Sequence, residues 1–272
     1  MFRKLAGVLG MLVTSLAVNA QQNILIYSGP GAGELSVANT LTTIKQLVGD
    51  KYNVITVGPK VLIDDAWLEN TALLIMPGGA DRPYLTKLKG IGNANIRRFV
   101  ENGGKYIGIC AGAYYSADRI EFVTDYGLEV VAERELKFYP GLIKGPTYAG
   151  YDHRNVAGYA GARAETISWQ ATDQLALGEN FTVFYYGGGS FIAAENYPSV
   201  TILAKYQQNG PVAIVECLVG KGKAILSSPH FEWDPETLEQ NSPQICDITP
   251  KLRAGNKKRL LLAKHLIQRL GL

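Results

Sequence analysis

The amino-acid sequence predicts an α/β domain: a mainly parallel sheet flanked by helices, with added β-hairpins. Short apolar runs alternate with helical patterns through the first half of the chain, and glycine or proline clusters end most of these runs. The second half is rich in β-branched and aromatic residues. The chain has 272 residues, 47% of them hydrophobic, which is enough to bury a sizeable core in one domain.

The first half of the chain predicts the parallel part of the sheet. The expected strands cover residues 23–28, 52–57, 72–79 and 105–110, and the expected helices cover 34–48 and 91–102. Strands that are separated by helices are expected to run parallel, because each helical crossover returns the chain to the same end of the sheet.

The second half predicts strands and hairpins, followed by a terminal helix. The expected strand segments are 128–146, 166–171, 181–192, 200–206 and 211–229, with the tightest turn at 219–222. A basic amphipathic helix is expected over 256–270. We expect it to pack on the sheet rather than lie on a membrane surface, because its apolar side needs a face to bury. His265 falls in this helix and is expected at the surface.

The N-terminus has the pattern of a secretory signal. Arg3 and Lys4 precede a mostly apolar stretch over 5–18, and Val18-Asn19-Ala20 fits a cleavage site with small residues. We therefore expect cleavage after Ala20, a mature domain over 21–272 and a secreted or periplasmic protein. The alternative is an uncleaved membrane anchor, for which the apolar stretch is short. No later segment is apolar enough to span, so no membrane association is expected after cleavage.

Charge and cysteine content limit the classes of partner. Charged residues make up 19% of the chain and the net charge is +3, without blocks of like charge, so nucleic acid is not expected as a partner. An exported chain with three cysteines suggests a Cys217–Cys246 disulfide and one free thiol, although three reduced cysteines remain an alternative. No cluster has metal-ligand spacing, and we expect neither a metal nor another cofactor. The expected partner is a small molecule; the oligomeric state stays open.

The stretch Gly108-Ile-Cys-Ala-Gly112 follows an expected buried strand and predicts a sharp strand-to-helix turn. Such a turn presents a nucleophile, here Cys110, at the carboxyl edge of the sheet, where open α/β folds bind ligands. The start of a helix there would also favour the thiolate. The alternative is a buried structural cysteine before a glycine-rich helix start.

His230 and Glu232 follow another expected strand and supply a base and an acid that could orient it. Cysteine followed far downstream by histidine and a nearby acid is a pattern of nucleophilic catalysis. His153 lies in a loop and could line a pocket, but its sequence context matches no such pattern. A hydrogen-bonded loop histidine is the alternative for His230.

Gly78 and Gly79 follow the expected strand at 72–79 and allow backbone N–H groups to approach a substrate oxygen. The N–H groups of Gly79 and Ala111 are the expected oxyanion donors, and Gly78 is expected to contact the substrate. Many strand ends carry a glycine pair, so this signal is informative only beside Cys110 and His230.

These motifs together resemble the class I glutamine amidotransferase-like superfamily, and within it the N-terminal domain of fungal-type biotin–protein ligases. The resemblance spans nearly the whole mature chain. It is carried by YSGPGAG (27–33), MPGGADRPY (76–84), GICAGAYYSA (108–117), FYPGLIKGPTY (138–148), AGARA (160–164), YYGGGSF (185–191) and VGKGKAILSSPHFE (219–232). It implies a flavodoxin-like fold and a triad of Cys110, His230 and Glu232.

The sequence also departs from the patterns of related families. Glutamine amidotransferases usually carry glutamine four residues after the nucleophile, where it helps to hold the substrate; here that residue is Tyr114. A neighbouring family of peptidase and deglycase-like proteins has histidine directly after the cysteine, where this chain has Ala111. Neither a synthetase nor a biotin-ligase module follows in this sequence. Glutamine hydrolysis for biosynthesis and biotin transfer are therefore not expected.

Tyr186, Gly187 and Gly188 belong to the run YYGGGSF. They are candidates for a ligand-facing loop whose backbone N–H groups bind an anion, and a flexible turn between strands is the alternative. For the whole chain we expect an exported enzyme that hydrolyses or transfers at a C–N bond of a small substrate. The alternatives are a non-catalytic binding module with the same pocket and a structural or inhibitory partner domain.

Overall fold

A computed structural model describes residues 21–176, 178–207, 210–238 and 242–272. The predicted signal peptide at 1–20 lies outside the described residues, so export stays a prediction. Within the described ranges, no helix is both long and apolar enough to cross a membrane.

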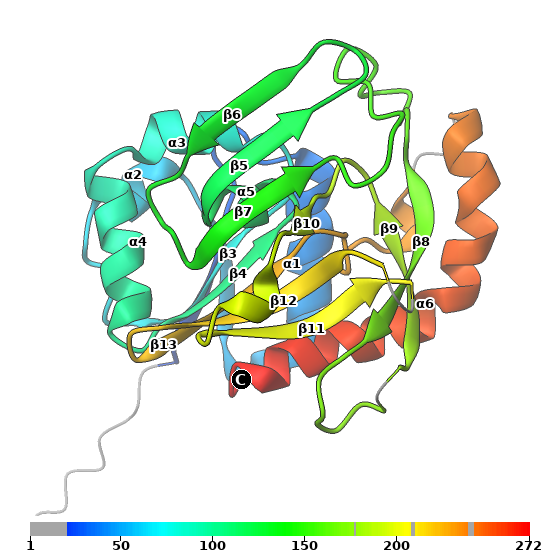
Figure 1. Cartoon of the computed structure of the whole chain (residues 1–272). Helices are drawn as coiled ribbons and strands as arrows, with labels where there is room; N and C mark the ends of the chain where they lie inside the picture. The colour runs from blue at the N-terminus through cyan, green and yellow to red at the C-terminus, as the bar shows by residue number, and fades with distance from the viewer. Residues whose placement is uncertain (1–20, 177, 208–209, 239–241) are drawn as a thin grey trace, which may run out of the picture.

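The centre of the molecule is a nine-stranded sheet (Figure 1) with the order β2-β1-β3-β4-β13-β12-β11-β8-β9. The first five strands of this order are parallel, and the last five, which share β13, are antiparallel neighbours. The parallel strands are β1 (Asn23–Tyr27), β2 (Asn53–Val57), β3 (Thr71–Met76), β4 (Lys105–Ile109) and β13 (Gly222–Ser227). The others are β12 (Val212–Val219), β11 (Val200–Tyr206), β8 (Arg163–Trp169) and β9 (Asn180–Tyr185). The predicted α/β fold is confirmed, and the hairpin turn at 219–222 joins β12 to β13.

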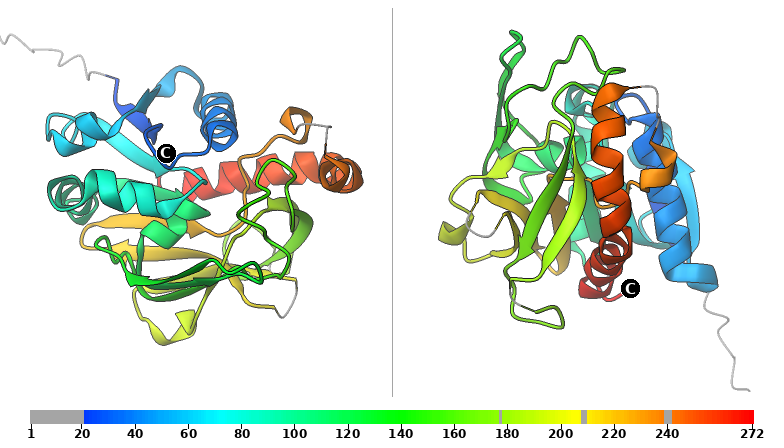
Figure 2. Two further views of the ribbon diagram at one scale, coloured as in Figure 1. Left: turned by 90° about the horizontal axis from the view of Figure 1, so that it is seen from above. Right: turned by 90° about the vertical axis from the view of Figure 1, so that its right-hand side faces the viewer.

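Helices cover both faces of this sheet (Figure 2) because alternate strand residues are apolar on both sides. Leu74 and Tyr106 pack with residues of α3 (Asp81–Leu88), α4 (Ile91–Glu101) and α5 (Ala111–Tyr115). The opposite side of the strands packs on α1 (Glu34–Val48) and α6 (Pro243–Arg269). The short helix α2 (Pro59–Ile63) contacts α4.

A second, four-stranded sheet has the order β10-β7-β5-β6 and covers the side of the central sheet that carries α5. Its strands are β5 (Ala117–Val123), β6 (Glu129–Glu133), β7 (Tyr139–Gly145) and β10 (Ser190–Phe191). Strand β5 was not among the expected strands. It begins directly after α5, so the second sheet is attached to the segment that follows Cys110.

The terminal helix differs from its prediction. It was expected over 256–270, but α6 begins at Pro243 and contains Pro250 in its interior. It is bent (Figure 1), as expected of a helix that carries Pro250 and Gly255. The expectation that His265 lies at the surface is wrong: the side chain is buried against the Trp169 ring.

The Cys217–Cys246 disulfide that the sequence suggested is not formed in the structure. Cys217 is a free thiol buried in β12, whereas Cys246 is exposed on α6. Burial raises the pKa of the Cys217 thiol. Cys217 therefore behaves as a small apolar core residue in this structure.

Candidate active site

Cys110 lies between the end of β4 and the start of α5, at the carboxyl edge of the parallel strands. Its backbone has φ 49° and ψ −104°, a region that non-glycine residues rarely adopt. The turn is tight: a Cβ on Gly112 would lie 2.0 Å from the Met76 carbonyl oxygen. The strained cysteine and its small neighbours have the geometry of a nucleophile elbow.

His230 and Glu232 follow β13, the strand beside β4 in the sheet. His230 Nδ1 lies 2.8 Å from Glu232 Oε1, and both side chains are buried. Burial acts to lower the pKa of His230. The charges of Glu232 and Cys110, together with the 2.8 Å contact to Glu232, outweigh burial and raise that pKa to about 10. The structure thus places His230 against Glu232 and in the same cavity as Cys110.

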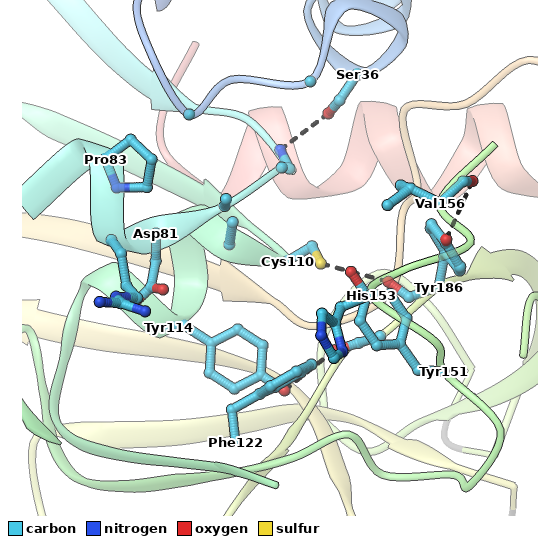
Figure 3. Close-up of a pocket in the computed structure, with 18 of the residues that line it drawn as sticks. Ser36, Asp81, Pro83, Cys110, Tyr114, Phe122, Tyr151, His153, Val156 and Tyr186 are labelled. Carbon is cyan, nitrogen blue, oxygen red and sulfur yellow. Dashed lines mark hydrogen bonds between the residues drawn. The ribbon is translucent and has the colours of Figure 1, made fainter. Parts of the chain in front are cut away.

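Ser36 connects Glu232 to Gly78 through hydrogen bonds that were not predicted from the sequence. Its hydroxyl, in the first turn of α1, donates to Glu232 Oε1 at 2.8 Å. The same oxygen accepts the Gly78 N–H at 2.9 Å (Figure 3). Glu232 Oε2 is buried and has no hydrogen-bond partner within the described ranges. The buried Arg259 guanidinium donates to the Phe231 carbonyl at 2.8 Å, and burial lowers the Arg259 pKa while the charges of Asp234 and Glu232 raise it.

Gly78 and Gly79 approach other atoms too closely for any larger residue. A Cβ on Gly78 would lie 2.4 Å from His230 Cε1, and a Cβ on Gly79 would lie 2.0 Å from the Gly31 carbonyl oxygen. Gly79 also has φ 144°. In the part of the chain that the structure describes, no loop or cap hydrogen bond occupies the N–H of Gly79 or Ala111. Both residues line the same cavity as Cys110.

Tyr114 lies one turn after Cys110 and lines the cavity. Its hydroxyl donates to the Gly187 carbonyl at 3.1 Å, and burial raises its pKa well above the usual value. The hydroxyl is therefore occupied within the protein, which leaves the ring to shape the cavity.

The run Tyr186-Gly187-Gly188 presents carbonyl groups to its neighbours. Cys110 Sγ lies 3.6 Å from the Tyr186 carbonyl oxygen, and Tyr186 and Gly187 line the cavity. Gly188 does not line the cavity, and its carbonyl accepts from the Tyr185 hydroxyl at 2.9 Å and from the Thr147 N–H at 2.8 Å. The structure therefore does not place Gly188 where a ligand in this cavity would contact it.

The cavity above Cys110 has a volume of about 1180 Å³. Loop 146–162 supplies part of its wall, and the Tyr151 and His153 side chains lie beside Cys110 (Figure 3). Burial and the charge of Cys110 raise the pKa of Tyr151 to about 12. The sequence suggested a pocket position for His153 but gave no signal for Tyr151. Among the described residues, no group of three or more His, Cys, Asp or Glu side chains is arranged to hold a metal ion.

Comparison with known families shows to which family the chain belongs. Residues 22–272 match the family model described as biotin-protein ligase, N terminal. The chain belongs to this family. A biotin–protein ligase of Schizosaccharomyces pombe is 34% identical over 254 residues, which cover 92% of this chain and 38% of that protein. The chain thus spans well under half of that relative.

Two further comparisons add a second relative and a solved structure with a similar fold. An uncharacterised protein of Chlamydia muridarum is 36% identical over 254 residues, 92% of this chain and 95% of that protein. The structure is similar to that of a ThuA-like protein from Bacteroides uniformis, with a TM-score of 0.52, 12% identity and 89% of each chain covered. The biotin–protein ligase N-terminal family member described here therefore shares its fold with this ThuA-like protein.

Proposed function

We propose that this family member is a cysteine-dependent hydrolase or amidotransferase that acts on a C–N bond of a small molecule. The observation that carries the proposal is the position of Cys110 on a strained elbow, beside a buried His230–Glu232 pair whose imidazole pKa is raised to about 10. A charged imidazole stabilises a neighbouring thiolate, and a thiolate is the nucleophilic form of cysteine. Export from the cytoplasm is part of the same proposal.

The geometry supports a two-step acyl transfer. The Cys110 thiolate attacks the amide carbonyl carbon, and the N–H groups of Gly79 and Ala111 stabilise the oxyanion. The C–N bond breaks as His230 gives its proton to the leaving nitrogen, so an amine or ammonia departs and a thioester remains. Water, deprotonated by His230, then attacks the thioester carbonyl. The acid is released and Cys110 returns as the thiolate beside protonated His230, which Glu232 holds in one orientation.

Alkylation of the folded protein by iodoacetamide tests this proposal. Intact mass and peptide mapping locate the modified cysteine, with Cys110→Ala as the blank. We expect Cys110 to react and His230→Ala to slow that reaction at least tenfold. His265→Ala is the matched control, because it removes a buried histidine far from Cys110 in the sequence and on α6. Equal rates in wild type and His230→Ala would contradict the proposal.

A binding module without turnover is the second candidate, and one contact favours it. The 3.6 Å approach of Cys110 Sγ to the Tyr186 carbonyl oxygen suits a neutral S–H donor, because a thiolate and a carbonyl oxygen repel each other. A slow alkylation reaction that is independent of His230, combined with saturable ligand binding by Cys110→Ala and wild type alike, would support this second candidate.

A further inference from the structure

One wall of the cavity is formed by a hairpin that the proposed chemistry does not use. Strands β5 and β6 pair in antiparallel register, and Phe122 lies directly opposite Val130. Both side chains line the cavity and are half-buried. Ile120 and Leu128 extend the same wall. All four hairpin residues that line the cavity are apolar.

The other face of the hairpin has a different environment. Val123 and Val131 are 52% and 55% exposed, and each follows a cavity-lining residue in sequence. Because side chains alternate between the faces of a strand, Phe122 and Val130 point inward while Val123 and Val131 point outward. The two faces therefore provide matched pairs of positions on the same two strands.

Aromatic rings connect the hairpin to the nucleophile. The Phe122 ring packs edge-on against Tyr114, with centroids 5.6 Å apart, and against Tyr151, with centroids 5.5 Å apart (Figure 3). The hydroxyl of Tyr114 is already taken by Gly187, so the ring offers an apolar surface. The Phe122 ring thus joins the hairpin to two aromatic residues that line the cavity with Cys110.

The size of the cavity matches a substrate larger than a free amino acid. Its volume of about 1180 Å³ exceeds the range of roughly 300–1,000 Å³ that is typical of small-molecule pockets. Charged lining residues come from α1 and α3: Glu34, Arg82 and Lys87 are exposed. Asp81, by contrast, is half-buried and pairs with Arg134. An apolar substrate group that covers this half-buried wall removes apolar surface from water, which favours binding.

We propose that the β5–β6 hairpin determines substrate specificity, and that the substrates are amides carrying a large aliphatic or aromatic group. This inference rests on the proposed function for the chemistry, but the apolar preference can be measured without turnover. The apolar group lies on Phe122 and Val130 while the carbonyl carbon reaches Cys110.

Alkylation by matched iodoacetamides tests this inference. N-hexyl and N-(2-hydroxyethyl) iodoacetamide carry the same reactive carbon: the Cys110 sulfur bonds to the CH2 carbon and iodide leaves. Each buried methylene is worth up to about fourfold in binding. We expect the second-order rate constant for the hexyl reagent to exceed that for the hydroxyethyl reagent by about thirtyfold or more, after correction for their reactivity with free cysteine.

Four variants assign that preference to the hairpin. Val130→Ser should reduce the hexyl preference about tenfold, whereas Val131→Ser on the outer face of the same strand should leave it unchanged. Phe122→Ala and Val123→Ala form a second pair, so the test survives if one inner variant does not fold. Loss of preference in the outer variants as well would overturn the assignment.

The outcomes separate this inference from the proposed function. Equal corrected rates for both reagents, with reactivity that still depends on His230, would overturn the apolar substrate class and leave the proposed hydrolase standing. A hexyl preference that persists when reactivity does not depend on His230 would overturn the hydrolase alone. Hairpin variants that change the oligomeric state without changing the hexyl preference would show that this wall contacts a second copy, which overturns the inference.

Discussion

Replacing Glu232 by glutamine should uncouple His230 from its charge partner. In the structure Glu232 Oε1 lies 2.8 Å from both His230 Nδ1 and Ser36 Oγ. The Glu232→Gln side chain has nearly the same shape, so the packing changes little. The charge that chiefly opposes the burial of His230 is lost, although the Cys110 contribution remains. We therefore expect the His230 pKa to fall from about 10 to its ordinary value of about 6.5 or below.

The sign and size of the effect follow from the same pKa. The folded-state pKa of His230 is raised above the unfolded value, so its contribution to stability is fully present below about pH 6.5 and is lost as the pH rises through about 10. The difference corresponds to an upper limit on the order of 5 kcal/mol, at about 1.4 kcal/mol per pH unit. This upper limit agrees with the cost of about 3–5 kcal/mol for removing one partner of a buried ion pair. Glu232→Gln should lose most of this stability at pH 6 and little at pH 11.

Two measurements check this prediction. The imidazole chemical shifts of His230, followed by NMR across pH, report its pKa directly, and urea unfolding at pH 6 and above pH 10 reports the stability. Glu236→Gln is the control, because Glu236 is an exposed acid that pairs with Arg253. An unchanged His230 pKa in Glu232→Gln, or an equal loss of stability at both pH values, would refute the reasoning.

Three further experiments have defined expected outcomes. Ser36→Ala leaves the buried Glu232 with one fewer hydrogen-bond donor, so the free energy of unfolding should fall by about 1–3 kcal/mol and the His230 pKa should shift. Urea unfolding and NMR measure these two quantities, and no change in either would mean that the Ser36 hydroxyl does not position Glu232. Free glutamine should be hydrolysed slowly or not at all, because the Tyr114 hydroxyl is occupied by Gly187; ammonia release measured against Cys110→Ala checks this, and efficient release by wild type would contradict it. The exported protein should begin at Gln21, and a secreted product whose intact mass still includes residues 1–20 would refute the cleavage site.

The predictable strands are those whose apolar residues form continuous runs in the sequence. The strands β1, β3 and β4 are continuous apolar runs that stop at turn residues, and their positions match the expectation within one or two residues at most boundaries. Strand β5 was missed because three of its seven residues are charged and interrupt the apolar pattern, and because it follows a helix of only five residues. The start of α6 was missed because Pro250 and Gly255 argue locally against a continuous helix.

The residues of the candidate site that lie at the ends of sheet strands were predictable from the sequence. Cys110 and His230 follow strands that a parallel sheet is able to place side by side, and both motifs are visible in the sequence. Ser36 was not predictable, because it lies 196 residues from Glu232 and a serine early in a helix usually has no such role. The inward position of Tyr151 depends on the path of loop 146–162, which no periodic pattern determines.

The central position of β13 has a consequence for how the protein is made. This strand lies between β4 and β12, yet its residues Gly222–Ser227 are among the last of the sheet to leave the ribosome. Until then one edge of β4 stays open, and open edges are the surfaces through which nascent chains aggregate. A translation product that stops before Gly222 carries Cys110 but not His230. The Cys110 thiol therefore meets His230 only after a further 120 residues have been synthesised, so a chain truncated between the two residues lacks the assembled site.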